Sequence, residues 1–416
     1  MARIVRLLDI VTTNQRLNGF RPWVKLLLMA AMILPFWSPQ AWCQQKVGAY
    51  AGRFLNLVNS ARANGMGACA IDLVNEESAL YNPGGVGLFH LDKTIAVAWP
   101  QSTKWIPTLT SGERLKSYTL SAGMSSQRLH WGKNPLLNVS LAFAFSRLEL
   151  DDNSLGDPMF RRRDRADCYT VAIGVDYLIR VGIGYTYKRV TEDLTMSWYP
   201  YSSSYSFSSS FVANGRDVGI TVELPLWRVW HLKHPQKALE PPPAVRIMPR
   251  CTYVIANRGT GRLTGSGNDP VSESDIPLSG VSRKSLSLHA SYTKNDLALV
   301  SVTLVGEIEK ERFGGDKAQK RGVELGIFEM VYGRVGNLKD NRLGSHGTDI
   351  NTLGFGFSLN GLNKYTRIIE RVHPSQTRLR WLLANLDVRF DYARYGGNDN
   401  QAYYYDTKFY KLTISL

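Results

Sequence analysis

The sequence predicts an all-β fold, a 14-stranded antiparallel transmembrane β-barrel whose N-terminal segment forms a hatch, or plug. Three observations predict it. An export signal stands at the N-terminus, glycines and small residues crowd together shortly after it, and apolar residues alternate with period two along most of the remaining chain. We place the signal peptide at 1–43, the hatch at 44–87 and the barrel at 88–416.

The first segment has the layout of a secretory signal peptide. Basic residues lead into Leu26–Trp37, a run of 12 uncharged and mostly apolar residues, and a cleavage site follows near Cys43. A membrane-spanning helix needs about 20 apolar residues, so this run is too short to be one. The bulky Trp42 argues against a lipidated Cys43. We therefore expect an exported protein of the Gram-negative outer membrane.

The alternation is clearest in Leu137–Ser146, where large apolar residues take one face and small or polar residues the other, and Cys168–Tyr177 repeats it. Soluble β-sandwich strands alternate in the same way. Here, however, the second face is small or charged and aromatic residues stand near the strand ends. The segments also have the length of a tilted membrane strand, about 9–11 residues. These details favour a barrel whose apolar face meets lipid.

The count of candidate strands is 14, an even number, as expected for a closed barrel with both ends on one side. They lie near 88–100, 116–126, 136–149, 167–178, 180–191, 215–226, 246–257, 283–293, 296–309, 322–328, 330–338, 352–361, 385–394 and 408–416. The connections expected outside the cell are 150–166, 192–214, 258–282, 310–321 and 339–351. Tight turns near 178–180, 293–296 and 328–329 are expected on the periplasmic side.

The net charge of +15 bears on the partners of the protein. An exported protein rarely meets nucleic acid, so nucleic acid is not an expected partner. Outer-membrane lipid and lipopolysaccharide are, because their phosphates attract Lys and Arg. The run Arg161–Arg165 is a candidate contact, with a solvated loop as the alternative. Cys69, Cys168 and Cys251 lack metal-ligand spacing, so we expect small buried residues there, and no metal or cofactor.

Two short stretches carry the hatch prediction. Ser60–Ile71 and Asn75–Phe89 are rich in glycine and alanine, and a plug inside a narrow lumen must turn sharply beside the wall. Glycine tolerates the positive φ of such turns, and proline fixes φ while removing a donor. The hatch residues singled out are Gly65, Met66, Gly67, Asn82, Pro83 and Gly84. Leu55–Arg62 is expected to form a short helix. An ordinary N-terminal cap with no gating role is the alternative.

Several motifs, taken in order, resemble the FadL-like outer-membrane barrels, and most closely the PorV/PorQ branch. They are Ala61–Gly67 (ARANGMG), Ala79–Val86 (ALYNPGGV), Arg216–Gly219 (RDVG), Ala256–Gly259 (ANRG), Gly322–Glu324 (GVE), Gly333–Gly336 (GRVG) and Asp391–Ala393 (DYA). The resemblance implies that the N-terminal segment folds back into the barrel. The chain departs from the family at Gly84-Gly85, where Ala-Gly is usual, and at Leu416, where the family usually ends in an aromatic residue.

Charged residues on the small, polar face of the strands are expected in the lumen. The residues are Asp176, Glu324, Arg334, Asp387, Arg389 and Asp391. We interpret them as mutually balancing charges that hold the hatch, rather than as a catalytic site. No enzyme motif is visible, although His90, His130 or His289 could serve beside one of the many serines.

Two functions from different classes remain open, and a surface or structural barrel with no cargo is a third possibility. The PorV/PorQ resemblance implies an accessory of type IX secretion, which binds cargo proteins with C-terminal signal domains and passes them to surface-attachment machinery. A loop at 196–211 has the composition of an adaptable recognition surface, with Trp198, Tyr199, Tyr201, Tyr205 and Phe207 as its aromatic residues. The alternative is uptake of hydrophobic small molecules, as in the fatty-acid transporters of the same group. Transport predicts an apolar path from loops to hatch, and cargo binding predicts a filled lumen with a broad outer surface.

Overall fold

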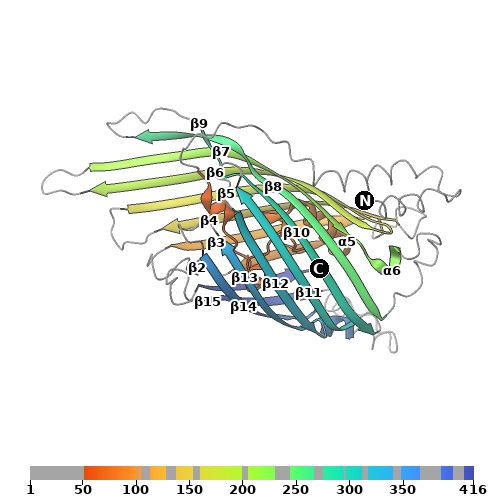
Figure 1. The fold of residues 1–416 in the computed structure, drawn as a ribbon. Helices are drawn as coiled ribbons and strands as arrows, with labels where there is room; N and C mark the ends of the chain where they lie inside the picture. The colour runs from red at the N-terminus through yellow and green to blue at the C-terminus, as the bar shows by residue number, and fades with distance from the viewer. Residues whose placement is uncertain are drawn as a thin grey trace.

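The computed structural model describes 51–100, 102–104, 113–127, 137–152, 160–198, 205–229, 244–266, 275–294, 297–311, 317–340, 348–365, 386–396 and 407–416. The predicted signal peptide lies outside these residues. The described part is one antiparallel sheet that closes on itself, with an N-terminal segment packed inside it (Figure 1). None of the described helices is long and apolar enough to cross a membrane.

The sheet closes because its first strand pairs with its last. β1 (Ile95–Pro100) lies between β16 (Lys408–Ser415) and β3 (Arg114–Ser125). The other wall strands follow in chain order: β4 (Asn138–Asp152), β5 (Phe160–Asp176), β6 (Arg180–Trp198), β7 (Tyr205–Glu223), β8 (Val245–Ser266), β10 (Val281–Lys294), β11 (Leu297–Glu311), β12 (Lys317–Ile327), β13 (Val331–Asp340), β14 (Thr348–Ser358) and β15 (Asp387–Gly396). These are 14 strands, and the short β2 (Thr103–Lys104) and β9 (Asp275–Pro277) add to β3 and β8. The predicted fold class is confirmed.

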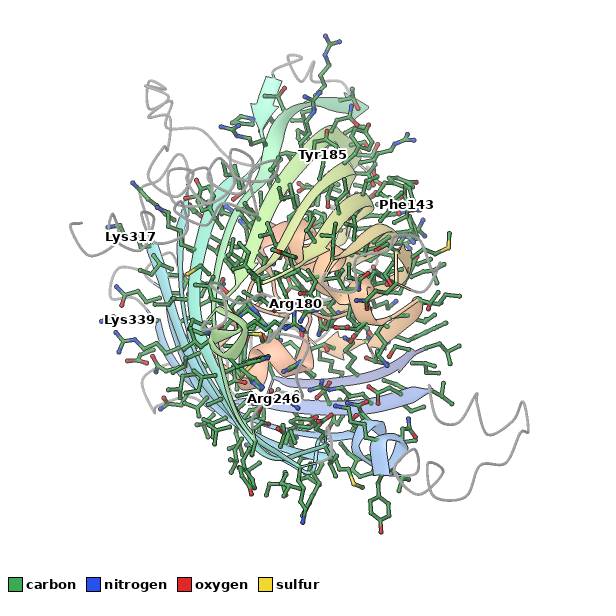
Figure 2. All side chains as sticks on the ribbon, turned by 90° about the vertical axis from the view of Figure 1, so that its right-hand side faces the viewer. Phe143, Arg180, Tyr185, Arg246, Lys317 and Lys339 are labelled. Carbon is green, nitrogen blue, oxygen red and sulfur yellow. The ribbon has the colours of Figure 1, made fainter. Side chains whose placement is uncertain are left out.

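The wall is apolar outside and polar inside, the reverse of a soluble protein. Phe143, Ile173 and Leu304 are outward-facing and 54%, 50% and 46% exposed, while Ser140, Thr170 and Glu307 face inward and are buried. Phe143 lies on the outside of the wall in Figure 2, which looks into the barrel from one end. An apolar outer band and a closed strand order are what a bilayer requires of a barrel. The chain is therefore a transmembrane β-barrel of the outer-membrane type.

The two ends of the barrel differ. One, the turn end, carries the short connections 177–179 and 328–330, the C-terminus and the short helix α6 (Leu226–Val229). The other, the loop end, carries the far ends of β6 and β7, which project furthest in Figure 1, with the ends of β5 and β8 beside them. The predicted loops 192–214 and 258–282 are thus mostly strand. The prediction failed there because the outward apolar alternation stops while the backbone pairing continues.

The wall also begins later than predicted. Residues 88–94 were assigned to the first strand, but helix α5 (Pro83–Asp92) covers 88–92 and β1 begins at Ile95. The predicted hatch boundary at 87 therefore falls inside a helix. A short, mostly apolar stretch such as Leu88–Leu91 (LFHL) does not by itself distinguish a strand from a buried helix, which explains the error.

Candidate functional site

The hatch runs the length of the lumen. It enters at the loop end, where Ala51 forms a β-bridge with Leu278, and it leaves at the turn end through α5. Between them lie η2 (Arg53–Asn56), α3 (Ala61–Gly65) and α4 (Ser78–Tyr81). Nearly every hatch residue is buried. The expected helix at 55–62 is instead two shorter helices, with Ser60 capping α3 through a bond from the Ala63 amide.

The first hatch motif is pressed against the wall at β12–β14. Gly67 has φ 69°, and a Cβ on it would lie 2.5 Å from the carbonyl oxygens of Arg321 and Asn337. Glycine is therefore required at this residue both by the positive φ and by the close approach of the wall backbone. Its amide donates to Thr352 Oγ1 at 2.9 Å, and the same hydroxyl donates to the Gly65 carbonyl at 3.2 Å. The backbone of the hatch is thereby fixed to the wall.

The second hatch motif faces the opposite side of the lumen. Asn82 is fully buried, and its side-chain amide donates to the Ile71 carbonyl and to Thr221 Oγ1, both at 2.8 Å. Pro83 is not a turn residue as predicted but the first residue of α5, a position that suits proline. Gly84 does not have the positive φ that was expected of it. It is needed instead for close approach, since a Cβ would lie 2.7 Å from the Gly182 carbonyl oxygen.

Three charged clusters tie the hatch to the wall. In the first, Arg62 of α3 binds Glu324 of β12 at 2.6 Å, and Arg334 of β13 binds the same carboxylate at 2.6 Å. Arg334 also binds Asp391 of β15 at 2.8 Å, and Arg389 completes the chain to Asp391 at 2.9 Å. Glu324, Arg334 and Asp391 are buried. Four of the six predicted lumen charges therefore meet here around one hatch arginine.

The second cluster centres on Lys411 of β16. Its ammonium lies 2.7 Å from Glu76 and 2.8 Å from Glu77, two adjacent hatch carboxylates that are both buried. Burial alone would raise both pKa values, but Lys411 lowers the pKa of Glu76 below its ordinary value. The pKa of Glu77 stays raised by burial, with the negative charge of Glu76 adding to the rise and Lys411 opposing it.

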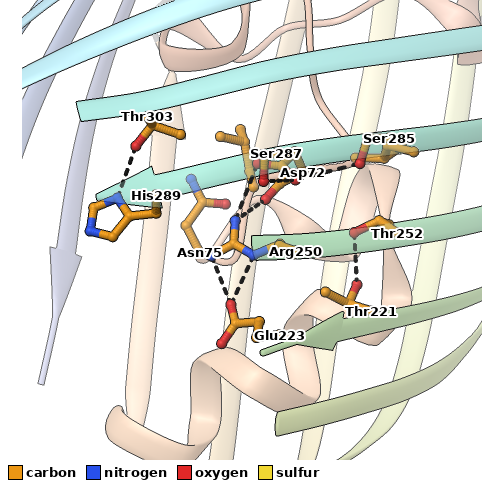
Figure 3. Close-up of polar contacts among 12 residues, drawn as sticks. Asp72, Asn75, Thr221, Glu223, Arg250, Thr252, Ser285, Ser287, His289 and Thr303 are labelled. Carbon is orange, nitrogen blue, oxygen red and sulfur yellow. Dashed lines mark hydrogen bonds and ion pairs between the residues drawn. The ribbon is translucent and has the colours of Figure 1, made fainter. Parts of the chain in front are cut away.

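The third cluster is drawn in Figure 3. Arg250 of β8 binds Asp72 of the hatch at 3.2 Å and Glu223 of β7 at 2.7 Å. Ser287 Oγ of β10 donates to Asp72 at 2.7 Å. Burial raises the pKa of Asp72, although Arg250 opposes the rise. Arg180, at the centre of the view in Figure 2, holds the other oxygen of Glu223 at 3.0 Å.

The first two clusters combine charged groups of the wall with charged groups of the hatch. The wall contributes Arg334, Arg389, Lys411, Glu324 and Asp391, and the hatch contributes Arg62, Glu76 and Glu77. Without the hatch, the wall residues carry three cations and two carboxylates, and Lys411 loses both of its carboxyl partners. Uncompensated charge is costly at a buried site, so this arrangement favours a seated hatch.

Toward the loop end, the inner face of the wall carries a ring of buried apolar residues interspersed with buried charged ones: Leu150 is directly opposite Asp164, and Leu338 is directly opposite Lys320. We call this ring the apolar collar; its residues are Leu115, Leu148, Leu150, Val190, Phe211, Leu278, Val281, Leu338, Ile350, Tyr395 and Phe409. All are buried, and Phe54, Leu55 and Val58 of the hatch belong to the same packed cluster. The loop-end part of the lumen therefore combines apolar residues with buried ion pairs, such as those of Glu309 with Arg283 and Lys320.

The remaining predicted residues lie elsewhere. Asp176 binds Arg228 of α6 at the turn end, 2.5 Å away, and Asp387 accepts a bond from Ser358. Trp198 ends β6 and is paired with Tyr205 of β7, and Phe207 is paired with Met196. Tyr199, Tyr201 and His130 lie outside the described residues. His90 Nδ1 lies 2.9 Å from the Lys93 carbonyl oxygen, and His289 Nδ1 lies 3.0 Å from Thr303 Oγ1.

Cys69 and Cys168 are buried, whereas Cys251 is exposed on the outer face of β8, contrary to the expectation of a buried residue. Within the described ranges, no group of three or more His, Cys, Asp or Glu side chains could hold a metal ion.

Several residues of the site were not predicted from the sequence: Arg62, Asp72, Glu76, Glu77, Arg250 and Lys411. A signal existed for Lys411. Tyr410, Leu412 and Ile414 alternate along the last strand, which assigns Lys411 to the inner face. The three hatch carboxylates had no such signal, because hatch residues do not alternate between two faces and so give no prediction of where a side chain points.

The closed wall, the apolar outer band and the seated hatch define the class of protein: a 14-stranded outer-membrane β-barrel with an internal hatch. No protein-family model matches the sequence, and no curated protein matches it.

Solved structures with a similar fold include a Pseudomonas aeruginosa FadL homologue, at 10% identity and a TM-score of 0.41, over 86% of this chain and 97% of that one. The CymD monoaromatic hydrocarbon channel matches at 11% identity and a TM-score of 0.40, over 85% and 94%. The Pseudomonas putida toluene transporter TodX matches at 9% identity and a TM-score of 0.35, over 86% and 96%. These likenesses are of fold alone.

Proposed function

We propose that the protein is a gated outer-membrane channel for small hydrophobic molecules, closed by its hatch. The apolar collar is the observation that carries this proposal. A channel for polar solutes is lined by polar side chains, as in porins. A ring of leucine, isoleucine and phenylalanine side chains offers no hydrogen bonds, and it favours solutes that gain by leaving water.

The hatch residue Phe54 occupies the place in the collar that a hydrophobic solute would take. It is 2% exposed and packed within the collar cluster, so the collar already holds an aromatic ring supplied by the chain itself. A hydrophobic solute that enters from the loop end would compete with this ring. The charged clusters below the collar hold the rest of the hatch to the wall. An apolar solute is unfavourable beside these charges because it would separate them from their partners, so it passes only when the hatch shifts.

Fluorescence titration with 1-N-phenylnaphthylamine, an apolar aromatic probe, tests the proposal on the purified barrel in detergent. Phe54→Ala removes the competing ring, so it is expected to tighten probe binding several-fold. Leu150→Asp places a charge in the collar and is expected to abolish binding. Val212→Asp, on the outer face of β7 beyond the apolar band, is the matched control and should leave binding unchanged. Equal binding by all four proteins, or none by any, would overturn the proposal.

A second function, the accessory of type IX secretion that the PorV/PorQ resemblance implies, has one observation in its favour. β6 and β7 project furthest at the loop end, ending in the Trp198–Tyr205 pair, and with β5 and β8 on either side they form a broad surface there. A tag inserted between Ser266 and Asp275 would allow pull-down from solubilised outer membranes. Recovery of secreted proteins that share a C-terminal domain, lost when 198–205 is replaced by a short glycine turn, would support this role. Recovery of the barrel alone would count against it.

A further inference from the structure

The outer face of β4–β6 shows where the lipid band ends. Phe145, Tyr169 and Tyr187 are directly opposite one another on neighbouring strands, and the rings of Phe145 and Tyr169 lie 5.4 Å apart. The next outward residues toward the loop end are Arg147, Asp167 and Arg189. A row of aromatic side chains followed by a row of charged ones is the expected order at a membrane interface.

Three arginines gather at this border on the projecting strands. Arg216 of β7 is directly opposite both Tyr187 of β6 and Arg258 of β8. Arg189 lies on β6, two residues beyond Tyr187, and all three arginine side chains are exposed. We call Arg189, Arg216 and Arg258 the arginine triad.

The triad is not balanced by the protein. In the described part of the chain, none of the three arginines forms an ion pair. The carboxylate opposite Arg189 is Asp167, but its two oxygens bind Arg147 and Arg165. Like charges placed directly opposite on paired strands destabilise a sheet. An anion bound between them would remove that repulsion.

The position of the triad identifies the anion. Below it, the outward residues of the same strands are Tyr185 and Val218, which are 43% and 49% exposed within the apolar band. An anion here would therefore sit at headgroup height with acyl chains running along the wall beneath it. Guanidinium groups bind phosphate in a bidentate manner and are weakly hydrated, which suits this interface.

We propose that the arginine triad binds a phosphate of a phosphorylated glycolipid, of the lipid A type, in the leaflet around the loop end. This site is separate from the collar and the hatch, and it does not depend on which solute the channel takes. It also differs from the Arg161–Arg165 run. There Arg162 faces inward and pairs with Asp164, and Arg165 pairs with Asp167.

The test is native mass spectrometry and thermophoresis of the purified barrel titrated with bis-phosphorylated lipid A. Replacing all three arginines by alanine is expected to weaken binding by on the order of 100-fold, from about fivefold for each basic residue near an anionic surface. The matched control, K310A/K317A/K339A, removes three exposed outward lysines from β11, β12 and β13 and should change affinity less than threefold. Lys317 and Lys339 are seen projecting outward in Figure 2.

Two further arms keep the proposal falsifiable. Triple Arg→Lys variants retain the charge but lose bidentate geometry, so intermediate affinity is expected, and heat-modifiable migration in gels verifies that each variant folds. Lipid A without phosphates should bind wild type no better than the triple alanine variant. If the arginine-to-alanine triple variant and the K310A/K317A/K339A control weaken lipid binding equally, the proposal is wrong. It is also wrong if dephosphorylated lipid binds as well as the phosphorylated form. Competition by inorganic phosphate at the same concentration would likewise assign the site to free phosphate.

Discussion

The two sides of the lumen hold the hatch by different means. On the side of β12–β16, charge dominates: Arg62 is bound to Glu324, and Glu76 and Glu77 share Lys411. On the side of β3–β7, α5 lies against small residues of the wall. A Cβ on Gly174, Gly182 or Gly184 would lie within 2.4 Å of a hatch carbonyl oxygen. The β12–β16 side combines buried ion pairs with close backbone contacts at Gly67, whereas close backbone contacts dominate where α5 meets the β3–β7 side.

This difference has a physical consequence. Ion pairs in a low dielectric are costly to leave half-made, so the charged side resists any displacement that separates one partner from the other. Close backbone packing has no such directional penalty along the helix axis, but it fails as soon as volume is added. The charged side should therefore respond to charge removal and to pH, and the glycine side to side-chain size.

The largest expected effect is on the charged side. Glu324→Ala leaves the cations of Arg62 and Arg334 without their shared carboxylate in a buried site. We expect a loss of about 3–5 kcal/mol in the free energy of unfolding. Urea unfolding of the barrel in detergent, followed by tryptophan fluorescence, measures it.

The control for this prediction is Glu149→Ala, whose contact with Arg147 is 3.9 Å long and outward-facing. It should cost less than about 1 kcal/mol. The Arg62→Ala/Glu324→Ala double variant should lose less than the sum of the two single losses, because the partners interact directly. Additive losses would show that this ion pair does not hold the hatch.

On the glycine side, Gly184→Ala should unseat α5. The added methyl group would lie 2.3 Å from the Pro83 carbonyl oxygen, and neither backbone can yield without moving the helix. We expect a loss of about 2 kcal/mol, a typical overpacking cost, and faster protease cleavage within the hatch. Gly306→Ala is the matched control, since nothing lies within 4 Å of a Cβ there. Similar cleavage rates in both variants would contradict the contact.

A smaller effect is expected at the polar contact beside α5. Asn82→Ala removes both bonds from its side-chain amide and leaves the Ile71 carbonyl without that donor. The expected loss is about 1–2 kcal/mol, measurable as faster amide hydrogen exchange in α4 and α5. Asn337→Ala, on the exposed outer face of β13, is the control and should change exchange little. An unchanged exchange pattern in Asn82→Ala would show that the Asn82 side chain does not hold α4 and α5 in place.

The same comparison shows how far sequence reasoning reaches. Wall strands such as Val323–Ile327 could be predicted because lipid outside and lumen inside impose period two on every residue. That period also placed Glu324, Arg334 and Asp391 on one face. It could not show that they meet around Arg62, because closure of the barrel and the path of the hatch bring them together.

The hatch itself was only partly predictable. Gly67 was identified for the correct reason, its positive φ. Gly84 was assigned the same reason but needs glycine because the Gly182 backbone approaches it. A sequence records that a small residue is required, whereas the cause depends on which strand lies opposite. The projecting parts of β6–β8 were missed because residues beyond the lipid band have no apolar face to alternate.

The smallest effect distinguishes two adjacent carboxylates of the charged side. Lys411 lowers the pKa of Glu76 despite its burial, so Glu76 stabilises the seated hatch above its ordinary pKa and loses that contribution as pH falls through the lowered value. Burial raises the pKa of Glu77, so its contribution is present below its ordinary pKa and is lost as pH rises through the raised value.

Isosteric variants separate the two roles. At pH 8, Glu76→Gln should destabilise the seated hatch by about 1 kcal/mol, because Lys411 then loses the carboxylate that stays ionised. Glu77→Gln should cost little at pH 8 and should reduce the fall in hatch stability as pH rises from 5 to 8. Amide hydrogen exchange of α4 across that range measures both. If Glu77→Gln were the more damaging variant at pH 8, the assignment of charge within the pair would be reversed, and the seated hatch would depend on both carboxylates being ionised.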